Sequence, residues 1–380
     1  MQQRFTASDP HEDNGPLAAL GRMRAPCARD DIGKYRRNHD ATTDNKAPPD
    51  ASQTDASRAF PMVTVPRKIE NQAKPILVYD FVSPSRLRST DSDSSDLVAI
   101  NREGLEKIGM SGTEQFSEAQ LDSIIHRVHP KIVVVLDTRQ ESHGFVEGRP
   151  VSWMALDNRN WGNVDKATGE ILPKESKKLD KFAARFDGAS LHIPYGSMAK
   201  KKSSLPPILV NVQRDNVESE QKLVERKGCV YFRIPIPDHA APDLEAMDHL
   251  SDHVRTLVRE KGLDNLHFVV HCRGGMGRTT LVMSALDMLV NAREVSSHDI
   301  IARQVKLRRR AESSIHAPGK EYKKEFRKEK EEVLQAFHRY AAANPVSAPG
   351  AISLKTWAAA ESSTGNPVVR AGAKSDDTAN

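Results

Sequence analysis

The chain has little cysteine and no long apolar run. Its 380 residues include three cysteines, Cys27, Cys229 and Cys272. They are too few and too widely spaced for a disulfide framework or a zinc site, which agrees with a reducing compartment. No stretch approaches a membrane span, and no secretory-type apolar core follows Met1. We therefore expect a cytosolic polypeptide with no metal, no other cofactor and no stable membrane insertion.

Apolar residues are also scarce, at 38% of the chain. This share is low enough to predict that part of the chain does not fold. Residues 1–72 are rich in Asp, Ser, Thr, Pro and Ala without apolar periodicity, and we interpret them as a disordered leader. Residues 73–345 are expected to form the folded domain. In the tail, residues 346–380, the apolar side chains Ile352, Leu354 and Trp357 predict partial packing.

The formal net charge is only +5, but the basic residues cluster. Residues 306–330 carry ten of them, namely Lys306, Arg308, Arg309, Arg310, Lys320, Lys323, Lys324, Arg327, Lys328 and Lys330. Such a run is usually a solvated helix face. Nucleic acid is disfavoured as a partner, because no helix-turn-helix or zinc-finger spacing accompanies the run.

Helices and strands alternate along the middle of the chain. Ser117 and Gln120 fit a capping box that opens a helix, which Pro130 ends. Residues 132–136 are a buried-strand pattern. An amphipathic helix over 244–257 then precedes a second strand at 268–270. Alternation of this kind predicts an α/β sheet flanked by helices, with the active site beyond the carboxyl ends of the strands.

The second strand leads directly into a glycine-rich loop with a cysteine. Cys272 is followed after six positions by Arg278, and the loop between them contains Arg273, Gly274, Gly275, Met276 and Gly277. Glycines let the backbone amides converge on one anion, and a guanidinium can grip two phosphate oxygens. A thiolate facing these amides and a helix N-terminus would be stabilised as a nucleophile. The alternative is that Cys272 is only a small buried apolar residue, which would leave the glycines and Arg278 without a purpose.

Two further residues complete the expected chemistry. The hydroxyl of Thr279 is placed to hydrogen-bond the thiolate and make it a better leaving group. Asp238, with His239 beside it, follows a short strand in a proline-stiffened loop and could protonate the departing oxygen. The alternative for Asp238 is a surface turn, since Pro-Asp pairs are common in turns.

Three blocks of the sequence resemble the bacterial cysteine phytases of the protein tyrosine phosphatase superfamily. The loop from His271 to Thr279 has the superfamily pattern His-Cys-x5-Arg-Thr. Residues 137–145, Asp-Thr-Arg-Gln-Glu-Ser-His-Gly-Phe, resemble the Asp-Leu-Arg-Gln-Glu-Ser-His-Gly block of these phytases, and residues 231–239 resemble their general-acid loop. The resemblance implies a phosphatase-type α/β fold with a small β-rich subdomain, here about residues 174–212, at the rim of the active site.

The resemblance also implies roles for individual residues. Cys272 would be the nucleophile, Arg278 the phosphate-binding arginine and Asp238 the general acid. The substrate would be bound by the remaining loop residues together with Arg88, Asp137, His239, Lys323, Arg327 and Lys330. The last three are spaced i, i+4 and i+7, so they share one helix face and could form a cationic wall for a highly phosphorylated ring.

The sequence departs from the family pattern at two of these positions. Arg273 stands where an acidic residue is common, and Arg327 replaces a tyrosine; both make the expected site more cationic. His143 and Trp153 are interpreted as braces of a loop rather than as catalytic groups.

The resemblance implies metal-independent hydrolysis of phytate and other inositol polyphosphates through a phosphocysteine. A protein tyrosine phosphatase, a phosphoinositide lipid phosphatase and an inactive phosphate-binding module remain alternatives. A polar leader joined to such a domain also resembles type III-secreted effectors of plant-pathogenic bacteria. This implies synthesis in the bacterial cytoplasm without a Sec signal and delivery into the host cytosol. The sequence gives no indication of oligomeric state.

Overall fold

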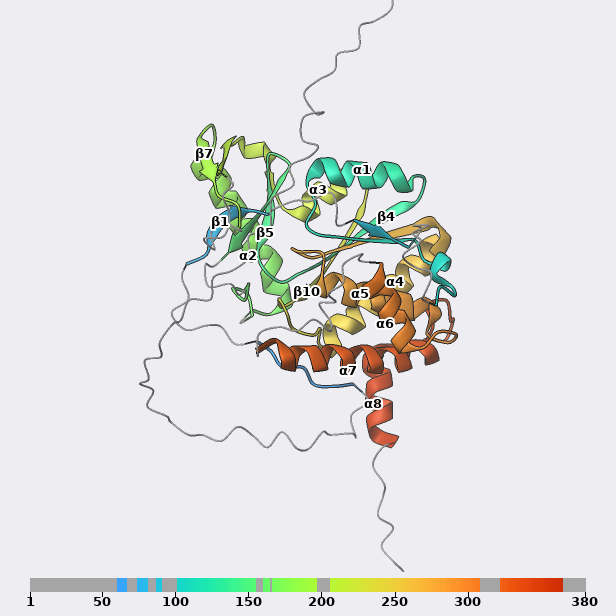
Figure 1. Cartoon of the computed structure of the whole chain (residues 1–380). Coiled ribbons are helices and arrows are strands. Elements are labelled where there is room, and N and C mark those ends of the chain that lie inside the picture. Colours follow the sequence, from blue (N-terminus) through green and yellow to red (C-terminus); the bar gives the residue numbers. More distant parts are fainter. Residues whose placement is uncertain are drawn as a thin grey trace, which may run out of the picture. The chain divides into compact units, whose positions relative to one another are not determined.

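The computed structural model of the chain has a mixed α/β fold (Figure 1). The structure describes residues 60–66, 74–80, 87–90, 101–154, 160–164, 166–196, 206–307 and 322–364. All of them belong to one compact unit, residues 55–380.

The main sheet has five strands in the order β10-β4-β11-β3-β2. Four of them run parallel, and β2 pairs antiparallel with β3 at the edge. The strands of this sheet are β2 (Arg88–Ser89), β3 (Met110–Thr113), β4 (Ile132–Arg139), β10 (Val230–Ile236) and β11 (Leu266–His271). Parallel strands are usually covered on both faces, which explains the unbroken apolar run at the start of β4.

Helices pack on both faces of this sheet, and one more, α2 (Thr168–Phe186), packs on the second sheet. The others are α1 (Glu118–Val128), α3 (Glu220–Arg226), α4 (Leu244–Lys261), α5 (Gly277–Asn291), α6 (Ser297–Lys306), α7 (Tyr322–Ala343) and α8 (Leu354–Thr364), with 3₁₀ turns η4 (Leu105–Lys107), η6 (Arg214–Asn216) and η7 (Leu263–Asn265). Successive side chains of β4 point to opposite faces of the sheet. Val133 and Val135 pack with α1 and α3, while Val134 and Leu136 belong to the larger core with α4, α5 and α7. Figure 1 shows α1 and α3 on one side of the sheet and the C-terminal helices on the other.

A second, antiparallel sheet has the strand order β1-β6-β5-β9. Its strands are β1 (Ile76–Tyr79), β5 (His143–Val146), β6 (Arg149–Met154) and β9 (Val217–Glu218), and a separate hairpin joins β7 (Ser190–Ile193) to β8 (Ile208–Asn211). The prediction of a β-rich stretch over 174–212 needs correction, because its first part belongs to α2. That helix buries Leu179 and Ala183 against this second sheet, as its amphipathic pattern requires.

Several local sequence patterns are confirmed. Ser117 and Gln120 form the capping box of α1, with the Gln120 amide bonded to Ser117 and the Ser117 amide bonded to Gln120. Helix α4 starts after the Asp243 cap and ends at Gly262, whose φ of 80° suits glycine. The strand over 268–270 lies within β11, and the helix after the loop is α5.

The boundaries of the folded part differ from the expectation. Phe60, inside the predicted leader, is buried in the main core, and the Thr64 amide donates to Glu329 Oε1 of α7 at 3.1 Å. The packed unit therefore begins before residue 73. In the tail, Leu354 and Trp357 are buried beside α4.

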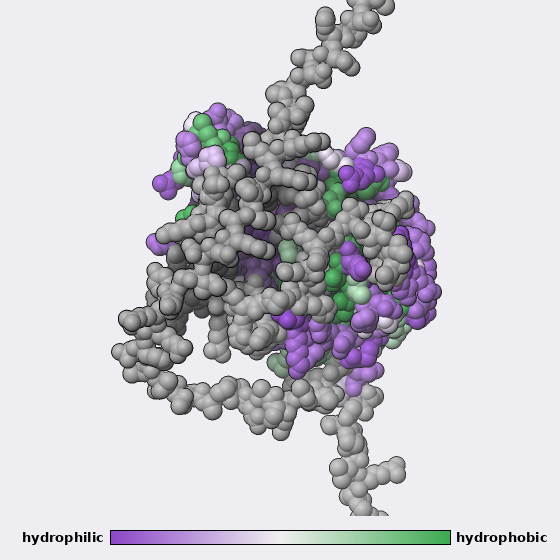
Figure 2. Space-filling model, viewed as in Figure 1, coloured by the Kyte–Doolittle hydropathy of each residue, from purple (hydrophilic) through white to green (hydrophobic). Residues whose placement is uncertain are grey.

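The described surface is mostly polar. Figure 2 shows hydrophilic side chains over most of the described part of the visible face, with small apolar areas between them. Within the described ranges, every helix is too short or too polar to cross a membrane.

Candidate active site

The phosphate cradle, residues 272–278, connects β11 to α5. Gly275 has a φ of +64°, and a Cβ there would lie 2.9 Å from the Thr113 carbonyl oxygen and still closer to the next amide. Only glycine satisfies both the turn and the close approach. Met276 precedes α5 and supplies no side-chain cap, so the first amides of the helix can receive an anion.

The nucleophile candidate lies at the start of this cradle. Cys272 is 4% exposed, and Thr279, on the first turn of α5, is fully buried. The Thr279 hydroxyl has no hydrogen-bond partner among the described residues. Its bond to the thiolate therefore stays a prediction, and the hydroxyl remains available for it.

Arg278 closes the cradle and is held by a carboxylate. Its two terminal nitrogens donate to Glu141 at 2.7 and 2.9 Å, and one of them also donates to the Ile236 carbonyl at 3.1 Å. Arg139 donates to Glu141 as well, at 3.0 Å, and continues to Asp80 at 3.0 Å. Burial alone would raise the pKa of Glu141, but Arg278 and Arg139 hold this pKa far below its usual range. The bidentate pair fixes the guanidinium plane at the position where phosphate oxygens would arrive.

The acid loop, residues 236–241, brings Asp238 to this arginine. A terminal nitrogen of Arg278 lies 3.4 Å from Asp238, and His239 Nε2 lies 3.5 Å from the same carboxylate. Both loop side chains are partly exposed, at 23% for Asp238 and 28% for His239. Burial would raise the pKa of Asp238, but the charges of Arg278 and His239 outweigh it and lower this pKa.

A buried network of charged groups lies beneath the cradle. His143 Nδ1 faces the Glu141 carbonyl at 2.9 Å, and its Nε2 lies 3.1 Å from Glu220 and 3.2 Å from Asp137. Both ring nitrogens face acceptors, so both carry hydrogen and the imidazole is a cation. Burial and Arg139 would lower the pKa of His143, but Asp137 and other carboxylates raise it to about 10. His143 is thus a brace, as interpreted from the sequence.

Asp137, His143 and Glu220 lie close enough together to share a metal ion. Their donor atoms are already used, since the Asp137 carboxylate accepts from Tyr231 at 2.8 Å and lies 3.2 Å from Arg233. A protonated His143 has no lone pair to give a metal. The arrangement therefore fits a hydrogen-bonded ion cluster better than a metal site.

The charge on His143 predicts a pH-dependent stability. A histidine with an unfolded pKa of about 6.5 and a raised folded pKa stabilises the fold fully below pH 6.5. This contribution should be lost as the pH rises toward about 10, the folded pKa. Urea unfolding at several pH values should show the decline, and His143→Gln should show a weaker dependence on pH over the same window. An equally steep decline in the variant would contradict this role.

Arg273 does not simply add positive charge to the cradle. Its Nε donates to Asp80 at 2.6 Å, and its side chain is 22% exposed. A Cβ placed on Gly196 would lie 2.1 Å from the Arg273 terminal nitrogen. Asp80 and the small residue at 196 therefore fix where this guanidinium lies.

We expect Gly196→Ala to displace Arg273 without changing any charge. The φ of Gly196 is not left-handed, so alanine is tolerated by the backbone and the flexible arginine must move. If Arg273 contacts substrate, the KM for a polyphosphorylated substrate should rise severalfold while kcat changes less, as expected for one partly exposed ion pair. Steady-state kinetics of Gly169→Ala, where a Cβ meets nothing within 4 Å, provides the control. An unchanged KM in Gly196→Ala would show that the position of Arg273 does not matter for binding.

The chain is similar to proteins of one family across most of its length. The sequence profile of the PTP-like phytases, described by the words inositol hexakisphosphate, matches residues 136–290. The structure superposes on a PTP-like phytase from Bdellovibrio bacteriovorus with a TM-score of 0.59 and 27% identity, covering 79% of this chain and 99% of that one. Residues 136–290 belong to the PTP-like phytase family.

Two further relatives extend the comparison. The PTP-like myo-inositol phosphatase from Mitsuokella multacida, solved in complex with myo-inositol-(1,3,4,5)-tetrakisphosphate, superposes with a TM-score of 0.60 and 26% identity, over 77% of this chain and 50% of that one. Effector protein hopD2 of Pseudomonas syringae pv. tomato is 31% identical over 287 residues, which are 74% of this chain and 59% of hopD2. The chain thus spans about three fifths of that relative. These likenesses show that the chain shares its fold with phosphatases of the PTP-like class.

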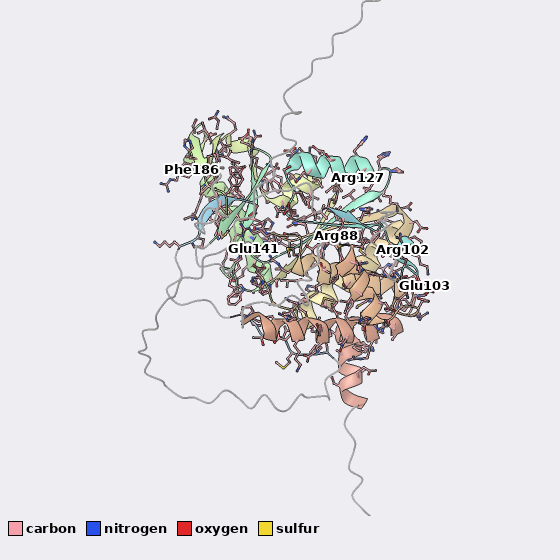
Figure 3. The ribbon with its side chains drawn as sticks, viewed as in Figure 1. Arg88, Arg102, Glu103, Arg127, Glu141 and Phe186 are labelled. Carbon is pink, nitrogen blue, oxygen red and sulfur yellow. The ribbon has the colours of Figure 1, made fainter. Side chains whose placement is uncertain are left out.

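Two residues that the resemblance assigns to substrate binding are buried. Asp137 is fully buried within the ion cluster, and its contact with substrate stays a prediction. His143, the first residue of β5 in the second sheet, places its Nε2 3.2 Å from this carboxylate. Arg88 is 6% exposed and donates to the Gly275 carbonyl at 2.8 Å and to Thr280 at 3.1 Å, which braces the cradle from behind. Its contact with substrate stays a prediction. Figure 3 shows Arg88 and Glu141 in the middle layer, between α1 and α7.

The three predicted residues of the cationic wall lie on α7. Lys330 is 6% exposed and Arg327 is half-buried, whereas the side chain of Lys323 lies outside the described residues. Their contact with a substrate stays a prediction. Cys27 also lies outside the described part of the chain.

Glu141, Asp80 and Trp161 are site residues that the sequence interpretation missed. Glu141 was within reach of prediction, because it stands in the block after β4 and an ionised arginine in a buried cradle needs a carboxylate. Asp80 and Trp161 carry no local pattern that marks them.

Proposed function

We propose that this PTP-like phytase hydrolyses myo-inositol polyphosphates, phytate among them, through a phosphocysteine intermediate and without a metal. The proposal is supported above all by the 3.4 Å contact between Asp238 and Arg278. This contact brings the expected acid to the arginine of the cradle, at the point where a phosphate ester would be held.

In the first step, the Cys272 thiolate attacks phosphorus and an S–P bond forms while the ester P–O bond breaks. Arg278 and the amides at the start of α5 stabilise the charge on the equatorial oxygens. Asp238 gives its proton to the departing alkoxide. In the second step, water attacks the phosphocysteine, Asp238 accepts a proton, and the electron pair of the S–P bond returns to sulfur.

The lowered pKa of Asp238 in the free enzyme fits this sequence of steps. Arg278 is one of the charges that lower this pKa. A bound phosphate dianion would offset that charge and place negative charge beside the carboxylate, so the pKa of Asp238 would rise on binding. Substrate binding itself would then favour the protonated acid.

The substrate class is inferred from charge. Arg273 of the cradle and Arg327 and Lys330 of α7 are cations in addition to Arg278, which would bind the reacting phosphate. A phosphorylated inositol ring carries several phosphates with which such additional cations could pair. The Mitsuokella relative bound to an inositol tetrakisphosphate supports the same class.

The test is phosphate release by the purified protein in the presence of a chelator, at equal concentrations of phytate, a phosphotyrosine peptide and a short-chain phosphoinositide. We expect the highest kcat/KM with phytate and no effect of the chelator. A preference for the peptide or the lipid would overturn the substrate class and leave the reaction standing. No release from any substrate would indicate an inactive phosphate-binding module.

We also infer delivery of the protein into a host cell by a type III system. The support is the similarity to an effector protein together with the polar composition of the first 59 residues. A translocation assay should lose its signal when residues 1–59 are deleted, a cut that keeps Phe60 in the core. Undiminished delivery would overturn this inference.

A further inference from the structure

The acid loop carries backbone strain beside its acid. His239 has a φ of +72°, a left-handed conformation that costs free energy for any residue with a Cβ. Such strain persists only where neighbouring groups hold the loop in place. Within the loop, the Ala240 amide donates to the Pro237 carbonyl at 3.1 Å. Further support must come from outside the loop.

Trp161 supplies such support. Its indole Nε1 donates to the Asp238 carbonyl at 2.8 Å, and its side chain is almost fully buried. The ring packs in a small apolar cluster with Ala240 of the acid loop and Phe326 of α7. The rings of Trp161 and Phe326 meet edge to face, with centroids 6.1 Å apart. Trp161 therefore contacts the loop on both sides of its strained residue.

The turn that carries this tryptophan is anchored beside the phosphate-binding arginine. Asn163 donates to the Gln140 carbonyl at 2.8 Å and to the Ser142 hydroxyl at 3.2 Å. Glu141, the partner of Arg278, stands between those two residues. One short segment, residues 161–164, thus connects the position of the acid to the position of the arginine.

The same tryptophan connects the acid loop to α7. Phe326 and Lys330 are four positions apart, so they lie on one face of this helix. Both are buried. The acid loop is therefore supported by the helix on which the predicted cationic wall stands.

From these contacts we propose that Trp161 is a positioning residue of the phosphatase reaction. It holds Asp238 in line with the cradle and relates the acid loop to α7. The inference rests on the proposed role of Asp238 as general acid, and it extends the site to a residue that touches neither the phosphate nor the nucleophile.

The test uses the dependence of the rate on the leaving group. Trp161→Phe keeps an aromatic ring and removes the N–H donor. Displacing the acid lowers the rate most for substrates whose leaving oxygen must be protonated. We therefore expect kcat/KM for phytate and for phenyl phosphate to fall about tenfold, which is less than the full contribution of a general acid. With 4-nitrophenyl phosphate, whose leaving group needs little protonation, the loss should stay below about twofold. Asp238→Asn sets the upper limit of this selective loss.

Two variants accompany the measurement. Trp153→Phe makes the same chemical change on β6, outside the acid loop, and should leave both rates unchanged. Phe326→Leu keeps the indole donor but loosens its packing, so kcat/KM should fall less than in Trp161→Phe, again mainly for the leaving groups that need a proton. This variant also tests the proposal if Trp161→Phe folds poorly. Equal losses on both leaving groups, or no loss at all, would overturn the positioning role. If the wild-type protein releases no phosphate from phytate, the proposed substrate is wrong. The rates on the two aryl phosphates would still test the role of Trp161.

Discussion

Cys272→Ser is expected to lower phosphate release from every substrate by about a thousandfold or more, since the reaction has no other nucleophile to form the intermediate. A serine hydroxyl in the same place stays protonated at neutral pH and is a far weaker nucleophile than a thiolate. The cradle itself should survive, since its shape depends on Gly275 and on the contacts of Arg278 rather than on sulfur. The variant should therefore still bind inositol polyphosphate in calorimetry while releasing no phosphate.

Cys229 offers a matched control for this substitution. It is also buried, but burial and the charge of Asp122 raise its pKa to about 11, so it is a neutral thiol at physiological pH. Cys229→Ser should keep the full rate. Comparable losses in both variants, or a substantial rate in Cys272→Ser, would contradict the phosphocysteine mechanism.

The cradle was predictable because its determinants lie in one short stretch, residues 271–279. A strand, a glycine turn and a helix start in this order restrict the backbone to few conformations. The structure has β11, Gly275 and α5 at the positions that the pattern predicts. The capping box of α1 is local in the same sense. Alternation of helices and strands predicts an α/β sheet, but it does not give the order of the strands in that sheet.

The supporting residues could not be predicted, because their partners are remote in sequence. Arg273 and Asp80 are 193 positions apart, and Trp161 lies 77 positions before Asp238. Spacing along the chain contains no information on such pairs. The partners of Asp137 were equally out of reach of a local pattern. Its carboxylate lies 3.2 Å from His143 and accepts from Tyr231, 94 positions later in the chain, so it belongs to an internal ion cluster.

The second large effect is expected for Glu141→Gln. The glutamine keeps the shape of the side chain but presents an amide donor to the guanidinium of Arg278, where the carboxylate now accepts two hydrogen bonds at 2.7 and 2.9 Å. Removing one partner of a buried ion pair leaves an uncompensated charge and costs about 3 kcal/mol or more. The free energy of unfolding should fall by this amount in urea, and kcat should fall because the arginine loses its fixed plane.

Inorganic phosphate then separates a local effect of Glu141→Gln from general damage. Phosphate in the cradle would supply the negative charge that Arg278 has lost, so it should raise the melting temperature of the variant more than that of the wild type. Glu170→Gln removes a carboxylate from an exposed pair with Lys174, whose side chains are 53% and 47% exposed, and should leave stability and rate unchanged. If phosphate stabilised Glu141→Gln no more than the wild type, the loss would lie outside the cradle. The idea that Glu141 holds the arginine ready for substrate would then fail.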